Sequence, residues 1–284
     1  MRVLVMLDGT PGGTLADPDA THVRVDDLGV TRGDGVFESV LVVDGAPREL
    51  DAHLDRLARS AAMLELPVPD RSAWAAAVRT VLAAWPLAGE MAVKLVCTRG
   101  PEYGDGGPTA FALGFEVPAK SRRNRTAGVT AVTLERGFDP AIVERAPWLL
   151  LGAKTLSYAV NMAANRYAES VGADEVIFIA ADNTVLEGPT STVVLVTDRT
   201  LRTPPPTSGV LLGTTQAALF RAAERAGWTT KVEPVDRAEL TAADGLFVVS
   251  SIRKISRIRA LDGVALPDAT DLCTELNALY ESEY

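Results

Sequence analysis

The segment at residues 149–167 constrains this chain most, because it places a lysine where proteins rarely keep one. An apolar run and Gly152 precede Lys154, and a mostly uncharged segment with helical character follows at residues 159–167. The charged form of a lysine loses hydration in apolar surroundings, so the neutral amine becomes available as a nucleophile or base. Amines of this kind form Schiff bases with carbonyl compounds. The alternative is a lysine at the start of a helix with its amine in water.

Residues 173–196 contain a second feature that narrows the chemistry. The pattern predicts a strand, a turn at Asp182 and Asn183, a short strand that ends at Glu187, and a Val-rich strand at residues 192–196. Pyridoxal phosphate is a carbonyl cofactor whose pyridine nitrogen needs an acidic partner, so that the ring stays protonated and accepts electrons. Glu187 could supply that partner. A solvated carboxylate at the end of a strand is the alternative.

Two more motifs lie upstream, RGDGVFE at residues 32–38 and HLDRL at residues 53–57. With Lys154 and the run EGPTSTV at residues 187–193, they resemble the fold-type IV pyridoxal-phosphate enzymes. This group holds branched-chain aminotransferases, D-amino-acid aminotransferases and aminodeoxychorismate lyases. The resemblance covers nearly the whole chain, and four separated motifs in matching order are more specific than any one of them.

The resemblance implies a D-amino-acid aminotransferase-like fold of the α/β class (α+β, two domains) and a homodimer with active sites near the domain junction. We expect a small N-terminal α/β domain at residues 1–118 and a larger cofactor-binding domain at residues 126–284. The polar residues 119–125 lack periodicity and are predicted to form the linker. Pyridoxal 5′-phosphate is the implied cofactor, with Lys154 as its Schiff-base lysine and Glu187 as the partner of its ring nitrogen.

A candidate phosphate site lies at the start of a helix predicted at residues 217–226. Thr214 and Thr215 precede this helix, so free N–H groups, hydroxyls and the helix dipole would converge on an anion. Simple N-capping by threonine is the alternative, and both can hold. The resemblance implies a phosphate role for four residues: Arg56, Thr192, Thr214 and Thr215.

Arg56 lies in a second predicted helix, at residues 51–64. Asp51 is placed to cap this helix, and Arg56 falls outside the apolar stripe that begins at Leu54. A guanidinium group suits a phosphate, and a surface arginine is the alternative. His53 is better explained as a brace at the helix start than as an acid–base group.

The resemblance also implies substrate contacts on segments that border the pocket. Alternation along the strand predicted at residues 36–43 puts Phe37 and Ser39 on one face, opposite Glu38. These two side chains could contact the cofactor or the substrate, or they could belong to a core face. Arg99, at the base of a glycine-rich loop, could bind a substrate carboxylate or could simply belong to the loop base.

A buried strand predicted at residues 246–251 ends in Ser250 and Ser251, and Arg253 follows. In the family the end of this strand lines the substrate pocket, so these three residues could recognise a carboxylate. A cationic cluster at this place would suit a dianionic substrate. The alternative is that the four cations of this segment are solvated: Arg253, Lys254, Arg257 and Arg259.

Composition argues against several other functions. The 284 residues carry a net charge of −9, whereas a general nucleic-acid binder needs a basic surface. No run approaches the roughly 18 apolar residues of a membrane span, and the first apolar run is too short for a signal peptide. Cys97 and Cys273 form no recognisable disulfide framework or metal site. We therefore expect a cytoplasmic protein with no nucleic-acid or membrane partner.

Together these features predict a pyridoxal-phosphate-dependent lyase that converts 4-amino-4-deoxychorismate to 4-aminobenzoate and pyruvate for folate biosynthesis. The chain is short, the hydroxyls and arginines near the implied pocket suit a diacid, and the aromatic residues expected around a branched-chain substrate are not evident.

Two alternatives stay open. The first is a class IV aminotransferase that acts on D-amino acids or branched-chain L-amino acids with a 2-oxo acid acceptor, because the pair Ser250 and Ser251 also resembles D-amino-acid aminotransferases. The second is a catalytically degenerate homologue that only binds a ligand. The presence of both Lys154 and Glu187 argues against the second.

Overall fold

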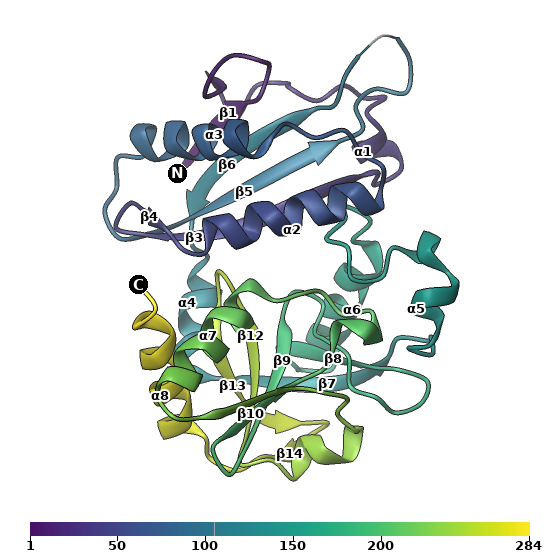
Figure 1. Cartoon of the computed structure of the whole chain (residues 1–284), viewed down its shortest axis with the longest axis vertical. Coiled ribbons are helices and arrows are strands. Elements are labelled where there is room, and N and C mark those ends of the chain that lie inside the picture. Colours follow the sequence, from purple (N-terminus) through teal and green to yellow (C-terminus); the bar gives the residue numbers. More distant parts are fainter. Residues whose placement is uncertain (105) are drawn as a thin grey trace. The chain divides into compact units, whose positions relative to one another are not determined.

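A computed structural model describes residues 1–104 and 106–284 of the chain (Figure 1). Asp105, in the glycine-rich loop that follows Arg99, lies outside the described residues. The chain forms two compact units, and each unit has its own sheet and its own helices. The mixed α/β class predicted from the sequence is confirmed.

The two units do not follow the chain strictly in order. The first unit contains Met1–Pro118 and the short segment Ala153–Tyr158. The second unit contains Ala119–Gly152 and Ala159–Tyr284. The domain expected at residues 126–284 would have included Lys154, which the structure instead groups with the first unit.

The first unit is built on a six-stranded antiparallel sheet in the order β2-β1-β6-β5-β3-β4. A tight turn at Asp44 and Gly45 joins β3 to β4, and both residues have the positive φ, 48° and 79°, that a type I′ turn requires. The strands are β1 (Arg2–Met6), β2 (Thr14–Ala16), β3 (Gly35–Val43), β4 (Ala46–Pro47), β5 (Glu90–Thr98) and β6 (Ala110–Glu116).

Two amphipathic helices, α2 (Leu50–Met63) and α3 (Arg71–Ala84), cover one face of this sheet (Figure 1). Leu57 of α2 and Trp74 of α3 are buried in one apolar core with residues of β3 and β5. Removal of this apolar surface from water is the main force that holds the helices on the sheet. A one-turn helix, α1 (Leu28–Thr31), precedes β3.

The prediction that Asp51 caps α2 is wrong, because the helix begins before this residue. The helix begins at Leu50, one residue earlier than predicted, so Asp51 lies in the first turn rather than at the N-cap. Glu49 precedes the helix in a left-handed conformation and makes no side-chain cap. The Asp51 carboxylate instead pairs with Arg71 at 2.7 Å.

The segment Ala153–Tyr158 belongs to the first unit because it runs beside the start of β3. The N–H of Phe37 donates to the carbonyl of Lys154 at 3.1 Å, and the N–H of Leu156 donates to the carbonyl of Gly35 at 2.8 Å. Local sequence patterns carry no signal for a pairing between segments this far apart in the chain, which explains why the sequence did not predict it.

The second unit is built on a mixed eight-stranded sheet, in which β14 pairs with β13 beside the path β11-β10-β9-β12-β13-β7-β8. The pairs β10–β11, β7–β13 and β7–β8 are parallel, and the other pairs are antiparallel. The strands are β7 (Val129–Glu135), β8 (Glu175–Ile179), β9 (Thr192–Thr197), β10 (Thr200–Thr203), β11 (Thr229–Val232), β12 (Gly245–Ser250), β13 (Lys254–Leu261) and β14 (Val264–Ala265).

Apolar side chains cover both faces of this sheet. Val194 of β9 belongs to a core that it shares with α7 (Thr214–Arg225) and α8 (Thr270–Glu281). Its neighbour Val193 belongs to a second core, which includes Leu240. A strand that is buried on both faces has an uninterrupted apolar sequence, which is why β9 reads as a run of valines without alternation. A further helix, α6 (Ala159–Ser170), packs against β8.

The segment expected to be the interdomain linker, residues 119–125, is helical and lies in α4 (Ala119–Ala127) of the second unit. A helix that is polar all round needs anchors outside itself. Arg125 supplies one by donating to the carbonyl of Ile252 at 2.6 Å, and Asn124 is buried. These contacts join residues distant in sequence, so they leave no periodic pattern from which the helix could be predicted.

Short helical turns occupy stretches that the sequence reads as loops. The segment before Lys154 contains α5 (Ile142–Arg145) and a 3₁₀ turn at Pro147–Leu149. A further 3₁₀ turn lies at Pro206–Ser208. Another lies at Arg237–Thr241, where the sequence predicts a short helix at residues 236–241. The helix predicted at residues 217–226 begins three residues earlier, at Thr214, because Gly213 is its N-cap.

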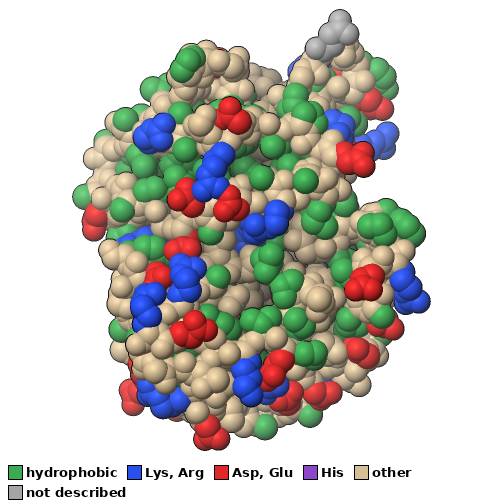
Figure 2. Space-filling view, viewed as in Figure 1, with side chains coloured by type: hydrophobic (Ala, Val, Ile, Leu, Met, Phe, Trp, Pro, Cys, Tyr) green, Lys and Arg blue, Asp and Glu red, His purple; other side chains and the backbone are tan. Residues whose placement is uncertain are grey.

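No helix of the described residues is long and apolar enough to cross a membrane. Within the same residues, no group of three or more His, Cys, Asp or Glu side chains could hold a metal ion. Cys97 and Cys273 are both buried free thiols, and burial raises the pKa of Cys97 to about 12. On the face drawn in Figure 2, basic and acidic side chains are interspersed and do not form a single basic area.

Candidate active site

Lys154 is held by its backbone while its side chain lies over an aromatic ring. Its N–H donates to the hydroxyl of Ser60 on α2 at 3.0 Å, and its carbonyl accepts from Phe37 on β3. The Lys154 amine lies 4.5 Å from the centre of the Phe37 ring, within reach of a cation–π interaction. The residue is half-buried, so its amine is sheltered but still within reach of a ligand.

The face of β3 that carries Phe37 and Ser39 collects further polar groups. Tyr158 packs edge-on against Phe37, with ring centres 5.4 Å apart. Lys94 of β5 pairs with Ser39 across the sheet, and its amine lies 5.7 Å from the Phe37 ring. Lys94 makes no ion pair with any described residue, although it is half-buried. Two amines therefore lie within about 6 Å of the centre of one aromatic ring.

Lys94 was not predicted from the sequence as a site residue, although a lysine inside an apolar strand is an unusual feature. It interrupts the apolar strand MAVKLVCT at residues 91–98, just as Lys154 interrupts an apolar segment. The alternation that places Ser39 beside Phe37 applies equally to the paired strand. Only the register between β3 and β5, however, brings Lys94 to the same ring.

The opposite face of β3 carries a buried carboxylate with two partners from α2. Glu38 accepts from Arg56 Nε at 2.6 Å and from Arg56 Nη2 at 2.8 Å. His53 Nδ1 lies 2.7 Å from the same carboxylate. Arg56 is only 6% exposed, so the surface alternative for this residue is wrong. Its role as a phosphate ligand stays a prediction.

The pKa values of this cluster follow from burial and charge together. Burial alone would raise the pKa of Glu38, but Arg56 and His53 outweigh it and hold that pKa below its ordinary value. Burial lowers the pKa of His53, and the positive charges of Arg56 and Lys154 add to the effect against the opposing pull of Glu38. The cluster is thus a carboxylate, a guanidinium and a neutral imidazole.

Arg99 is engaged at the base of its loop. Its Nε contacts Asp34 at 2.5 Å, and its two terminal nitrogens donate to the carbonyls of Leu64 at 2.8 Å and Glu65 at 3.2 Å. These contacts tie the loop to the end of α2 and to the segment before β3. They agree with the alternative that Arg99 belongs to the base of the loop. Recognition of a substrate carboxylate by Arg99 stays a prediction.

In the second unit, Glu187 lies beside a tight turn in which Gly188 is closely packed. One carboxylate oxygen of Glu187 accepts from the N–H of Leu211 at 3.0 Å. The next residue, Gly188, pairs with Ser191, and a Cβ at Gly188 would lie 2.3 Å from the Ser191 hydroxyl oxygen. Asn161 of α6 donates to the carbonyl of Pro189 at 2.7 Å. The turn holds Glu187 half-buried with a fixed backbone.

Four hydroxyl groups meet at the start of α7. Thr214 and Thr215 are its first two residues, and Gly213 forms the N-cap without a side-chain hydrogen bond. The Ser251 hydroxyl lies 3.3 Å from that of Thr215 and 3.5 Å from that of Thr214. A Cβ on Gly213 would lie 2.5 Å from the Thr192 hydroxyl oxygen, so the glycine lets β9 and α7 approach closely.

This arrangement brings together three of the residues expected to bind phosphate, Thr192, Thr214 and Thr215. It adds Ser251, which the sequence predicted at the substrate instead. Ser250 ends β12 and pairs with Lys254 across the hairpin. The substrate roles of both serines stay predictions.

Arg253 is not solvated. Its guanidinium contacts the buried carboxylate of Glu175, and burial lowers the pKa of Arg253 to about 10, against an opposing effect of Asp174. Lys254 is also largely buried and pairs with Glu281 at 2.5 Å. The solvated alternative is therefore wrong for these two cations, because carboxylates distant in sequence neutralise them inside the second unit.

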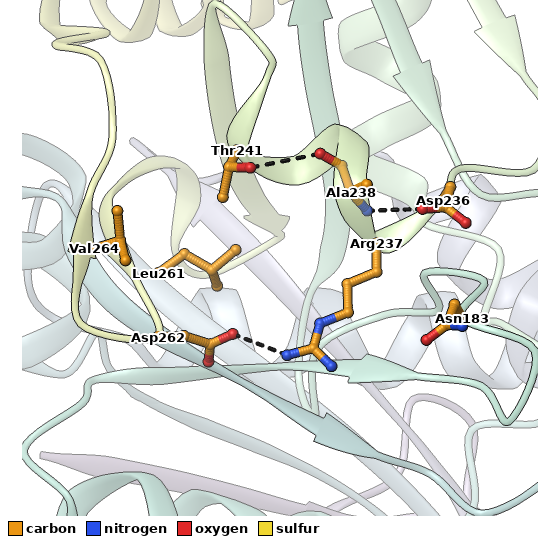
Figure 3. Close-up of a pocket in the computed structure, with 8 residues that line it drawn as sticks. All are labelled: Asn183, Asp236, Arg237, Ala238, Thr241, Leu261, Asp262 and Val264. Atoms are coloured by element: carbon orange, nitrogen blue, oxygen red, sulfur yellow. Dashed lines mark hydrogen bonds and ion pairs between the residues drawn. The ribbon is translucent and has the colours of Figure 1, made fainter.

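The second unit also has a surface cavity of about 450 Å³, which differs from the predicted site in the residues that line it (Figure 3). Arg237 contacts Asp262 at 3.3 Å across it. None of the predicted site residues lines this cavity. The lining residues are Asn183, Asp236, Arg237, Ala238, Thr241, Leu261, Asp262 and Val264.

Comparison with known proteins gives consistent similarities. The family model for amino-transferase class IV matches residues 35–261. A bifunctional aminodeoxychorismate lyase / D-amino acid transaminase of Mycobacterium tuberculosis is 43% identical over 267 residues, which cover 91% of this chain and 92% of that protein.

Two solved structures match over almost the full length. A fold IV-transaminase from Curtobacterium pusillum has a TM-score of 0.93 at 43% identity and covers 99% of both chains. A hypothetical aminotransferase from M. tuberculosis, in its PLP-bound form, has a TM-score of 0.94 at 41% identity and covers 100% of this chain and 98% of that one.

The depressed pKa of His53 predicts that acid weakens the fold. Native His53 stays neutral where the unfolded chain takes up a proton, so the unfolded state binds more protons and stability falls as the pH drops below about 6.5. The Glu38 carboxylate adds a second loss below about 4.5. Urea unfolding of the cofactor-free protein should show a loss of up to about 1.4 kcal/mol per pH unit from His53.

His53→Gln should flatten the stability profile between pH 6.5 and pH 5 (roughly the window in which an unperturbed imidazole titrates). His22→Gln removes the other histidine and is the matched control, which should keep the slope of the wild type. An unchanged slope in His53→Gln would contradict the assignment of a neutral buried imidazole.

Proposed function

Since the chain belongs to the class IV aminotransferases, we propose that it is an aminodeoxychorismate lyase, converting 4-amino-4-deoxychorismate to 4-aminobenzoate and pyruvate. Class IV aminotransferases use pyridoxal phosphate, so the chain is a pyridoxal-phosphate-dependent enzyme, as the sequence predicted. The lyase reaction itself is the proposal.

The donor groups of the chain fit this cofactor. Lys154 would hold its carbonyl carbon, and Glu187 would hold its ring nitrogen. The hydroxyls and the first N–H groups of α7 would hold its phosphate, as helix N-termini do for anions. Bound there, the cofactor supplies a ring that accepts electrons.

Lys154 and Glu187 would have different roles in proton transfer. The Lys154 amine would act as the general base for the carbon-bound proton of the substrate. Glu187 would keep the pyridine nitrogen protonated, and the turn at Gly188 and the contact with the Leu211 N–H hold its carboxylate. The Phe37 ring shelters the Lys154 amine from bulk water.

The observation that carries the proposal is Lys94, a cation near the Phe37 ring that has no ion-pair partner among the described residues. Arg99 and Arg253 are each engaged by a carboxylate of the chain, whereas Lys94 has no ion-pair partner among the described residues. A half-buried ammonium without a counter-ion favours an anionic ligand. The proposed substrate is a dicarboxylate, so it offers a carboxylate for this position.

A class IV aminotransferase that acts on D-amino acids or branched-chain L-amino acids, with a 2-oxo acid as acceptor, is the second candidate. The M. tuberculosis relative carries both a lyase and a D-amino acid transaminase activity in its name, and the C. pusillum structure is a transaminase. The lyase needs no amine acceptor and the transaminase does, which makes the two activities separable in one assay. Both reactions depend on Lys154, whereas a degenerate binding protein would show neither.

Purified, cofactor-loaded protein should release 4-aminobenzoate and pyruvate from 4-amino-4-deoxychorismate in the absence of any 2-oxo acid. Parallel wells with D-alanine or L-leucine and 2-oxoglutarate report the transaminase. Lys154→Ala should abolish both activities. Turnover confined to the amino-acid wells would overturn the lyase, and the preferred enantiomer would identify the transaminase.

Lys94→Met should raise the KM for the dicarboxylate by about 10- to 100-fold, because a charge-assisted contact of roughly 1.5–3 kcal/mol is lost. Lys94→Arg keeps the charge and should restore most of the affinity. Steady-state kinetics with the two variants measure this. An unchanged KM in Lys94→Met would remove Lys94 from substrate recognition.

We also propose a homodimer. In the second unit, α6 presents Val160, Met162 and Tyr167 to solvent, and Trp148 nearby in sequence is 74% exposed. Large exposed apolar side chains on one element mark an interaction surface. Light scattering should give twice the chain mass at micromolar concentration, and Met162→Glu should give the monomer mass. A monomeric wild type would contradict the proposal.

A cytoplasmic location and a place in folate biosynthesis complete the proposal. Both cysteines are free thiols, which is the usual state in a reducing compartment. Cell fractionation tests the location. Growth of a deletion strain only when 4-aminobenzoate is supplied tests the pathway, and growth without it would contradict the role.

A further inference from the structure

Ser60 makes a contact that joins the catalytic segment to the packed interior of the first unit. The residue lies in α2 and is 2% exposed. Its hydroxyl oxygen accepts the backbone N–H of Lys154 at 3.0 Å. Residues 60 and 154 are distant in sequence, so this single hydrogen bond links α2 to the backbone of the reacting lysine.

The backbone of Lys154 is thereby fixed from two sides. Its N–H bonds to α2 through Ser60, and its carbonyl accepts from the N–H of Phe37 on β3 at 3.1 Å. Leu156 continues the attachment by donating to Gly35 at 2.8 Å. The Lys154 side chain leaves this clamped backbone and reaches the face of the Phe37 ring. The position of the amine therefore depends on both anchors.

Ser60 is itself held in place by its helix. It lies one turn after Arg56 and two turns after His53, on the same side of α2, because residues three and four apart share a face. Arg56 and His53 both contact Glu38 of β3. The face of α2 that supports Lys154 is therefore fixed to β3 by a buried ion pair.

We infer that Ser60 is a positioning residue for Lys154, which sets the place of the lysine amine by holding its backbone N–H. This inference rests on the proposed function only in taking Lys154 as the reacting amine. A reacting group displaced by about 1 Å can lose on the order of 100-fold in rate, so a backbone anchor matters for catalysis without touching substrate. Loss of the hydroxyl also removes the acceptor of this part-buried N–H, which favours movement of the segment.

The test compares Ser60→Ala with Ser60→Thr, which keeps the hydroxyl. Ser60→Ala should lower kcat by about 10- to 100-fold and leave KM within about twofold, because substrate contacts are untouched. In the cofactor-loaded protein, the pH midpoint of the cofactor absorbance change should shift in Ser60→Ala. In the cofactor-free protein, hydrogen exchange should accelerate in the peptide that covers residues 153–158. Ser60→Thr should restore all three values towards the wild type.

Thr80→Ala is the matched control. Thr80 lies in α3 of the same unit, and its hydroxyl donates to the carbonyl of Gly12 at 2.8 Å, away from Lys154. It removes one helix hydroxyl and should leave kcat, the absorbance midpoint and the exchange of residues 153–158 unchanged. Should the added methyl of Ser60→Thr prevent folding, Ser60→Cys should give intermediate values, because a thiol is a weak acceptor.

Two failures can be told apart. A cofactor absorbance band that survives Lys154→Ala would overturn the proposed function, whatever Ser60 does. A band that depends on Lys154, with wild-type kcat, midpoint and exchange in Ser60→Ala, would overturn the role of Ser60. Equal effects of Ser60→Ala and Thr80→Ala would overturn it as well, since they would show a general loss of stability.

Discussion

The buried ion pair between Glu38 and Arg56 supports most of what surrounds Lys154. It joins β3 to α2 with two short hydrogen bonds, and His53 completes the shell of the carboxylate. A charge in a protein interior is tolerated only when it is paired and hydrogen-bonded, so removing either partner would leave an uncompensated buried charge. The strand and helix that this pair fixes are the two elements that hold the backbone of Lys154.

The side chains on the two faces of β3 thus have different roles. Glu38 points to the helix and secures the scaffold, while Phe37 points the other way and meets the amines of Lys154 and Lys94. Alternation along a strand makes this separation possible, because neighbouring side chains lie on opposite faces. A buried polar support on one side can therefore be rigid without crowding the side on which a ligand would bind.

The second unit uses close backbone approach in place of a buried ion pair. At Gly213 the absence of a side chain lets the Thr192 hydroxyl lie against the start of α7, and at Gly188 it closes the turn beside Glu187. The hydroxyls of Thr214, Thr215 and Ser251 lie together at the first turn of this helix, an arrangement that suits an anion. The proposed binding of a phosphate and a ring nitrogen by this unit therefore rests on backbone geometry as much as on side-chain identity.

Much of this was readable from the sequence. Periodicity predicted the helix at α2 and the opposite faces of Phe37 and Glu38, and the motifs predicted the family. Long-range placements were not readable: nothing local shows that Ser251 meets Thr215, that Glu175 neutralises Arg253, or that residues 153–158 pair with β3. Lys94 had a local signal, but its meaning depends on strand register.

The identity of the lysine that carries the cofactor is the central claim, and peptide mapping after borohydride reduction tests it most directly. Reduction fixes the cofactor to the amine that holds it, and mass spectrometry then locates the added mass. The account predicts that the mass lies on the peptide containing Lys154. Label on the peptide containing Lys94, or no label on either, would contradict it.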